Sequence, residues 1–223
     1  MLFRSLADLV SYNQKHNEAN GEENRDGSND NQSTNCGVEG PTSDPNILQL
    51  RRQLRRNHLA VLLLAHGVPL ILAGDEAGNS QNGNNNAYCH NNDIGWVKWS
   101  GLGREGEDMT GLVAQLTDIR RRYPQLRPRH WVDGRRPDGS FGVLWLTPQA
   151  HEMTEQDWKF PEGRFLAYVL GPVDEYPPLF IVLNSAPEAI EFTLPTIPEQ
   201  NTDRKSTRLN SSHIQKSRMP SSA

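Results

Sequence analysis

The spacing of apolar residues between positions 44 and 76 changes once, from a helical period to a short continuous run. Asp44 and Pro45 are a favourable N-cap and first helical residue, and Gly67 is typical of a left-handed C-cap. Residues 68–73 then form an apolar run whose length fits a buried parallel strand. One stripe of the predicted helix has helical spacing: Ile47, Leu50, Leu54, His58 and Val61. Helix, glycine, strand and polar residues in this order predict one unit of an α/β fold.

The later part of the chain predicts a different architecture. A helix is expected over residues 109–123, with its buried stripe at Leu112, Leu116, Ile119 and Tyr123. After Pro128 the pattern becomes that of strands separated by Gly, Pro and Asp turns, at residues 141–146, 165–170, 179–183 and 190–194. The sequence therefore predicts a small antiparallel β domain after an α/β part. Residues 201–223 have no apolar periodicity, and we interpret them as a non-native, disordered tail; the alternative is a native basic tail.

Composition narrows the class of protein. The 223 residues are 35% hydrophobic and carry a net charge of −4. No run approaches the about 18 apolar residues that a membrane span requires, so we expect no membrane association. The excess of acid gives no general attraction to nucleic acid. With only Cys36 and Cys89, and no signal-peptide core after Met1, the expected location is the cytoplasm.

Three polar stretches are candidates for ligand contacts. Residues 15–18 form a dense polar cluster in which His16 can bond a substrate hydroxyl, although a plain surface loop explains the pattern too. Six asparagines lie within residues 82–92, and Asn offers both a donor and an acceptor, but it is equally a common turn residue. Asp75 and Glu76 resemble a catalytic carboxylate pair. Adjacent strand residues point to opposite faces, however, so the alternative is that one structures the loop and the other faces the rim of a site.

Motifs for other chemistry are missing. The sequence contains neither CxxC nor HExxH, and the neighbours Cys89 and His90 lack further ligands at zinc spacing. It also has no glycine-rich phosphate loop and no nucleophile elbow. We therefore expect no metal and no cofactor. The arginine pairs at 51–52 and 55–56 are interpreted as solvated or salt-bridged faces of the first helix, with nucleic-acid binding as a remote alternative.

Several longer strings resemble one family. They are LADLVSYNQKHNEANGE at residues 6–22, NRDG at 24–27, AGDE at 73–76, GNNNAYC at 83–89, and EMT and DW at 152–154 and 157–158. Together they resemble the isoamylase-type glycogen debranching enzymes of the α-amylase superfamily of glycoside hydrolases. The resemblance implies that residues 1–128 are the C-terminal portion of a (β/α)8 TIM barrel, with residues 68–73 as strand eight. Residues 129–200 would be the C-terminal β-sandwich domain.

The resemblance also implies a function and its limits. The family hydrolyses α-1,6 branch linkages of glycogen and limit dextrin by a retaining mechanism with an Asp nucleophile and a Glu acid/base. The family string HDGFTL, which carries a third catalytic Asp, here reads MLFRSL, with Leu2 in place of that Asp. The nucleophile and the acid/base belong to earlier strands. We therefore expect no catalytic residue in this chain and no activity of the chain alone.

What remains for this chain is contact with an α-glucan partner at the rim of the site. The residues implied are Lys15, His16, Asn17, Asp75, Glu76, Asn85 and Tyr88. Two alternatives stay open. The chain can be a non-catalytic carbohydrate-binding or interaction protein, or an artefactual truncated gene product.

Overall fold

The structure is a computed structural model that describes residues 5–100, 103–136 and 139–196. It divides between Ile119 and Arg120 into two compact units, which is earlier in the chain than the predicted boundary at 128/129. The predicted tail at 201–223 and the position of Leu2 lie outside the described residues.

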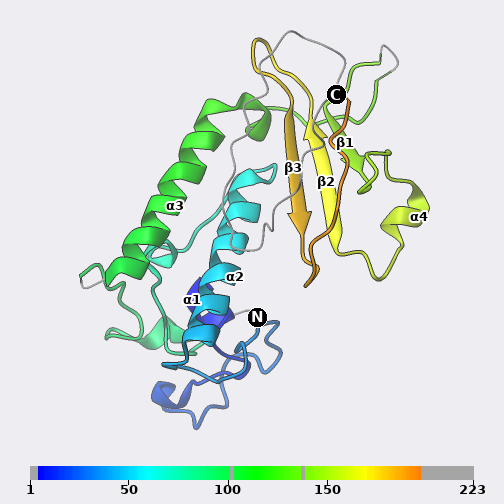
Figure 1. Cartoon of the computed structure of the whole chain (residues 1–223). Coiled ribbons are helices and arrows are strands. Elements are labelled where there is room, and N and C mark those ends of the chain that lie inside the picture. The colour runs from blue at the N-terminus through cyan, green and yellow to red at the C-terminus, as the bar shows by residue number, and fades with distance from the viewer. Residues whose placement is uncertain (1–4, 101–102, 137–138, 197–223) are drawn as a thin grey trace. The chain divides into compact units, whose positions relative to one another are not determined.

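Helices and short turns make up the first unit (Figure 1). The α-helices are α1 (Leu6–Leu9), α2 (Pro45–Leu64) and α3 (Gly103–Arg122), whose last residues belong to the second unit. Single 3-10 turns are η1 (Glu18–Asn20), η2 (Asp75–Ala77) and η3 (Ala87–Cys89). Helix α2 begins as predicted, because the Asp44 side chain accepts the Asn46 N–H at 2.8 Å and Pro45 follows it. None of the described helices is long and apolar enough to cross a bilayer.

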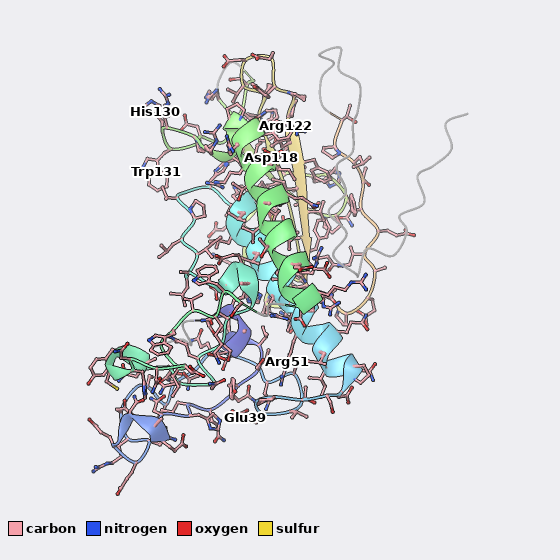
Figure 2. All side chains as sticks on the ribbon, turned by 90° about the vertical axis from the view of Figure 1, so that its left-hand side faces the viewer. Glu39, Arg51, Asp118, Arg122, His130 and Trp131 are labelled. Carbon is pink, nitrogen blue, oxygen red and sulfur yellow. The ribbon has the colours of Figure 1, made fainter. Side chains whose placement is uncertain are left out.

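The predicted buried stripe of α2 is wrong. Leu50 and Val61 are exposed, whereas Leu59, Leu63 and two arginines are buried. The two arginines determine which face of α2 is buried. Arg51 donates to loop carbonyls, and Arg55 forms an ion pair with Glu105 of α3. Helices α2 and α3 accordingly lie side by side (Figures 1 and 2). Hydrophobic spacing alone could not predict this orientation, because the groups that hold the helix are polar.

The strand predicted at residues 68–73 is also wrong. The first unit has no strand among its described residues, 5–100 and 103–119. Val68 is 97% exposed and Leu70 is 88% exposed. A strand forms only when a neighbouring backbone supplies the hydrogen bonds of the ladder. An apolar run reports a tendency to be buried, and it cannot report whether such a neighbour is present.

An antiparallel sheet forms the second unit, as predicted. Its strands are β1 (Val143–Leu146), β2 (Phe165–Leu170) and β3 (Leu179–Asn184), in the order β1-β2-β3. One face carries the buried cluster Leu146, Ala167 and Val169. The short elements are η4 (Pro124–Leu126) and α4 (Glu155–Trp158), which begins with a capping box between Thr154 and Asp157.

The fourth predicted strand, at residues 190–194, is not a strand. The ring of Phe192 instead lies 6.0 Å from the rings of Phe165 and Phe180, on the clustered face of the sheet. The backbone N–H of Thr193 donates to the carbonyl of Pro148 at 2.7 Å. This segment therefore covers the sheet with side chains without extending the ladder. The described residues hold one three-stranded sheet, so the second sheet of a sandwich stays a prediction.

Candidate functional site

A cluster of asparagines joins two loops that are far apart in sequence. We call Asn17, Asn20, Asn84, Asn85 and Asn86 the asparagine cluster. At its centre the Asn17 side chain donates to Asn85 Oδ1 at 2.9 Å, and the Asn85 backbone N–H donates to Asn17 Oδ1 at 3.0 Å. Both residues are 0% exposed. This reciprocal pair holds the loop after α1 against the Asn-rich loop.

The outer members of the cluster extend the same network. Asn84 Nδ2 donates to Asn20 Oδ1 at 2.6 Å, and Asn20 Nδ2 donates to the Asn86 carbonyl at 3.0 Å. Asn86 Nδ2 reaches Asp26 Oδ2 at 3.0 Å. An amide side chain both donates and accepts, so one residue type can close a network of this kind. The three asparagines that this loop contributes to the cluster thus have their partners within the protein.

Lys15 also makes its contacts with the protein. This buried side chain donates from Nζ to the carbonyls of Arg25 at 3.2 Å, Asp26 at 2.6 Å and Gly27 at 3.5 Å. An ammonium has three donors, and all three meet backbone oxygen. Lys15 therefore shapes the turn at 25–27, and its donors are not left over for a ligand.

His16 and Glu39 form the part of the site that reaches solvent. His16 Nε2 lies 3.3 Å from Glu39 Oε1, and the side chain of His16 is partly exposed. Glu39 also accepts the backbone N–H groups of Asn13 at 3.0 Å and Gln14 at 2.9 Å. Partial burial raises the pKa of Glu39, but these hydrogen bonds, with those from Asn35 and His16, outweigh it and lower the pKa to about 2. Figure 2 labels Glu39 and also Arg51, which donates to the carbonyl of the neighbouring Val38.

The depressed pKa of Glu39 predicts a pH-dependent stability. A carboxylate whose pKa falls from 4.5 to about 2 on folding stabilises the protein above pH 4.5 and loses that contribution as the pH falls toward 2. Glu39→Gln should therefore lower the melting temperature at pH 7, and the difference from wild type should shrink between pH 4.5 and 2. Melting curves followed by circular dichroism test this. A difference that is constant with pH would contradict it.

Asp75 and Glu76 lie in the turn η2 and not at the end of a strand. Asp75 is buried, and its Oδ1 accepts the Leu6 N–H at 2.7 Å. Burial raises the pKa of Asp75 to about 6, and the nearby Glu76 adds to this. Glu76 Oε2 accepts the Gly74 N–H at 3.0 Å. Asp75 thus has the structural role that the sequence left open for one member of the pair.

Sequence reasoning missed a second buried carboxylate, Asp8. It accepts the hydroxyl of Ser80 and the backbone N–H of Gln81, the latter at 2.7 Å. Burial raises the pKa of Asp8, and these hydrogen bonds lower it in part. Asp75 thus holds α1 against η2, and Asp8 holds α1 against the turn that follows η2. The only signal in the sequence was a single Asp within an apolar string, which is too common to be informative.

Tyr88 is the predicted contact with the most accessible side chain. It lies in η3, next to the buried Ala87, and is 76% exposed. The structure thus brings Lys15, His16, Asn17 and Asn85 together as one loop assembly, with Tyr88 on the same Asn-rich loop. Within the part of the chain that the structure describes, no group of three or more His, Cys, Asp or Glu residues could hold a metal ion.

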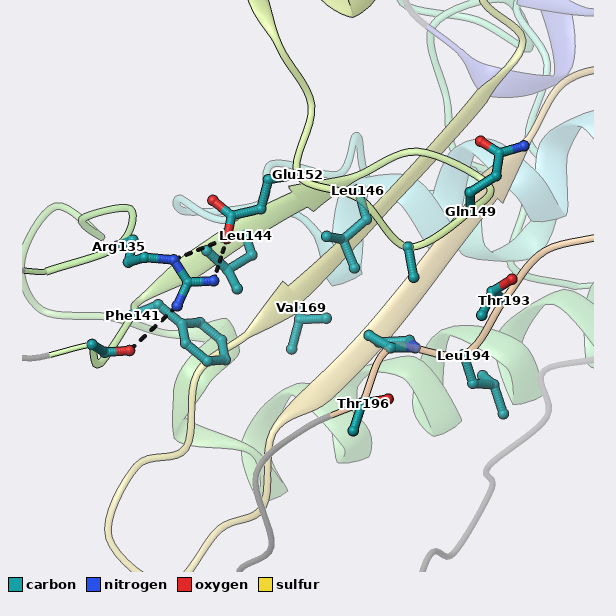
Figure 3. A pocket seen from close by; sticks show the side chains of 13 residues that line it. Arg135, Phe141, Leu144, Leu146, Gln149, Glu152, Val169, Thr193, Leu194 and Thr196 are labelled. Atoms are coloured by element: carbon teal, nitrogen blue, oxygen red, sulfur yellow. Dashed lines mark hydrogen bonds and ion pairs between the residues drawn. The ribbon is translucent and has the colours of Figure 1, made fainter.

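A separate cavity of about 440 Å³ lies on the sheet of the second unit (Figure 3). Its floor includes Leu144, Leu146 and Val169, and the ion pair of Arg135 with Glu152 lines it as well. None of the predicted glucan contacts lines this cavity. Glu152, part of one of the family-like strings, therefore serves here as the partner of Arg135.

Known proteins resemble this chain over most of its length. The "Glycogen operon protein GlgX homolog" of Mycobacterium tuberculosis is 47% identical over 157 residues, which is 69% of this chain and 22% of the relative. The "Glycogen debranching enzyme" of Serratia proteamaculans is 41% identical over 191 residues, which is 86% of this chain and 27% of the relative. The chain is a homologue of the glycogen debranching enzymes. A second glycogen debranching enzyme, from Klebsiella pneumoniae, is 46% identical over 156 residues, or 70% of this chain and 22% of the relative.

The homology to glycogen debranching enzymes confirms the family resemblance. No protein-family model matches the chain. The chain spans about a quarter of the length of these relatives, between 22% and 27%. The activity of the whole enzymes is therefore a matter of proposal for this chain.

Proposed function

We propose that this chain is the C-terminal portion of a cytoplasmic glycogen debranching enzyme and supplies contacts to the glucan. The intact enzyme would hydrolyse α-1,6 branch linkages of glycogen and limit dextrin by a retaining mechanism with two carboxylates. The observation that carries this proposal is the identity of 41% over 191 residues with a glycogen debranching enzyme. The first unit would form the end of a (β/α)8 barrel and the second a β-sandwich.

The contacts divide the predicted residues into two groups. Tyr88 and His16 present side chains to solvent, and an exposed aromatic ring can stack on a sugar while its hydroxyl bonds a neighbour. The other five bond the protein itself: Lys15, Asn17, Asp75, Glu76 and Asn85. We therefore assign direct glucan contact to Tyr88 and His16, and a positioning role to these five.

The second candidate function is a non-catalytic carbohydrate-binding protein. The same solvent-facing Tyr88 and His16 favour it, because they can bind sugar without any catalytic carboxylate. The two functions differ in their preferred ligand. A debranching enzyme must recognise the branch point, whereas a general binding protein need not distinguish linear from branched α-glucan.

Mobility of the purified chain in gels that contain glucan tests both functions. Limit dextrin should retard the chain more than a linear maltodextrin does, and Tyr88→Ala should weaken this binding about tenfold, or about 1.4 kcal/mol. Trp131→Ala is the matched control, because Trp131 is 99% exposed and lies in the other unit. Melting curves of both variants should stay close to wild type, because neither side chain is packed.

Each outcome separates the candidates. Equal retardation by linear and branched glucan favours the non-catalytic protein over the debranching enzyme. No retardation by either glucan contradicts both. If Tyr88→Ala lowers the melting temperature by several degrees, Tyr88 packs under its loop and the assigned sugar contact is wrong.

A further inference from the structure

The sequence contains two Asn-Gly pairs, Asn20-Gly21 and Asn82-Gly83, both in the loops that the asparagine cluster joins. An asparagine before glycine is chemically vulnerable. The backbone nitrogen of glycine is not crowded by a Cβ atom and can attack the carbonyl carbon of the preceding side-chain amide. The attack requires that this side chain be free to rotate toward the nitrogen. The two pairs differ sharply in this respect.

The side chain of Asn20 is fixed on both ends. Its Oδ1 lies 2.6 Å from both Asn84 Nδ2 and His90 Nε2. Its Nδ2 donates to the Asn86 carbonyl at 3.0 Å and to the carboxylate of Asp26. To react, Asn20 would have to give up all four of these contacts. Local opening of this kind costs free energy that slows any reaction from the open form.

The side chain of Asn82 has no such restraint. Asn82 is exposed, and within the described residues its side-chain amide makes no hydrogen bond. Its backbone N–H donates to Ser80 Oγ at 2.9 Å, so the backbone of the turn is placed while the amide stays in solvent. Asn82 and Gly83 have φ angles of 55° and 76°, the left-handed conformations that Asn and Gly tolerate.

We propose that Asn82 is a site of spontaneous deamidation and that the asparagine cluster protects Asn20. The Gly83 nitrogen loses its proton to a solvent base and forms a bond to Cγ of Asn82. The bond from Cγ to the amide nitrogen breaks, and this nitrogen takes up a proton from solvent and leaves as ammonia. Water then opens the cyclic imide. Attack at the side-chain carbonyl gives aspartate, and attack at the backbone carbonyl gives isoaspartate, in which the main chain runs through the former side chain.

The modification lies where it can disturb the site. Ser80 and Gln81 of the same turn donate to the buried carboxylate of Asp8, and the Gly83 carbonyl accepts the His16 N–H at 2.8 Å. Isoaspartate would lengthen the main chain by one carbon within this turn. Either product also adds a negative charge near Asp8. We therefore expect modified chains to hold α1 and His16 less firmly.

Peptide mapping by mass spectrometry tests the proposal. The folded chain is incubated in mildly alkaline buffer, and each Asn-Gly peptide is followed for the replacement of NH₂ by OH. Asn82 should convert at least about tenfold faster than Asn20, because only Asn20 needs local opening. In concentrated urea, where the cluster is absent, the two rates should be similar. Asn84→Ala, which removes one donor to Asn20, should raise the rate at Asn20 and leave Asn82 unchanged.

Three results would overturn the proposal. Asn20 reacting as fast as Asn82 in the folded chain would show that the cluster gives no protection. An intact Asn82 under conditions in which the unfolded chain reacts would show that the folded turn blocks the attack. An unchanged rate at Asn20 in the Asn84→Ala variant would show that the contacts of the cluster do not protect Asn20.

Discussion

Replacing Arg51 with methionine should lower the free energy of unfolding of the first unit by about 3 kcal/mol. The buried guanidinium donates to the carbonyls of Gly40 at 2.7 Å, Asn35 at 2.8 Å and Val38. Methionine keeps much of the apolar stem but leaves these carbonyls without their partner, and burying an unpaired acceptor is costly. Urea unfolding followed by circular dichroism measures the change.

Arg52→Met is the matched control for this prediction. Arg52 is the next residue on α2, is exposed, and reaches only Glu105, at 3.8 Å, among the residues that the structure describes. A surface ion pair contributes about 0–1 kcal/mol, so the control should stay close to wild type. Equal destabilisation by the two substitutions would mean that Arg51 acts through its charge and not through the loop carbonyls.

Gly27→Ala should destabilise the loop assembly by at least about 3 kcal/mol, well beyond the about 1–2 kcal/mol that a left-handed alanine costs. Gly27 has a φ of +71°, and a Cβ there would lie 2.3 Å from Asn85 Oδ1 and 2.5 Å from Asn17 Nδ2. The methyl group would therefore separate the reciprocal pair at the centre of the asparagine cluster. Thermal unfolding and hydrogen exchange of the loop amides measure the loss.

Gly21→Ala isolates the steric part of that effect. Gly21 has a φ of +83°, similar to Gly27, but no atom lies within 4 Å of the position of its Cβ. Both variants therefore lose stability because alanine disfavours the left-handed backbone, and only Gly27→Ala adds a steric overlap of its Cβ with neighbouring side chains. If the two variants unfold at the same temperature, the packing around Gly27 is looser than the structure shows and the prediction fails.

Local sequence signals predicted the positions of helices and strands better than they predicted what these elements pack against. The cap at Asp44 predicted the start of α2, and the apolar segment between Gly, Pro and Asp turns predicted β2 at its observed bounds, residues 165–170. The predictions that were wrong concern features that depend on residues far away in the sequence. The face of α2 is set by the carbonyls around Arg51 and by Glu105 on α3, and residues 68–73 have no neighbouring strand among the described residues. The spacing of apolar residues within a segment does not indicate such partners.

The candidate site shows the same division. The sequence singled out Lys15, Asn17 and Asn85 as polar groups in loops, and the structure brings these loops together. The sequence could not show that the donors of these side chains bond protein atoms. An amide or ammonium group that bonds a carbonyl looks the same in sequence as one that bonds a sugar. The sequence did not predict that Asp8 and Arg51 hold the loops in place. Both residue types are common in helices, so neither gave a signal of a buried role.

The centre of the asparagine cluster is made of neutral amides, and this sets how the loops respond to solution conditions. The Asn17 and Asn85 side chains have no proton to gain or lose in the usual pH range and no net charge for salt to screen. The exposed ion pair of Arg52 with Glu105, between α2 and α3, weakens as salt is added, whereas the buried guanidinium of Arg55 is screened less. Ionic strength therefore acts more on the Arg52 pair than on the centre of the cluster. The loops that carry His16 and Tyr88 keep their central fastening in dilute buffer and in concentrated salt alike.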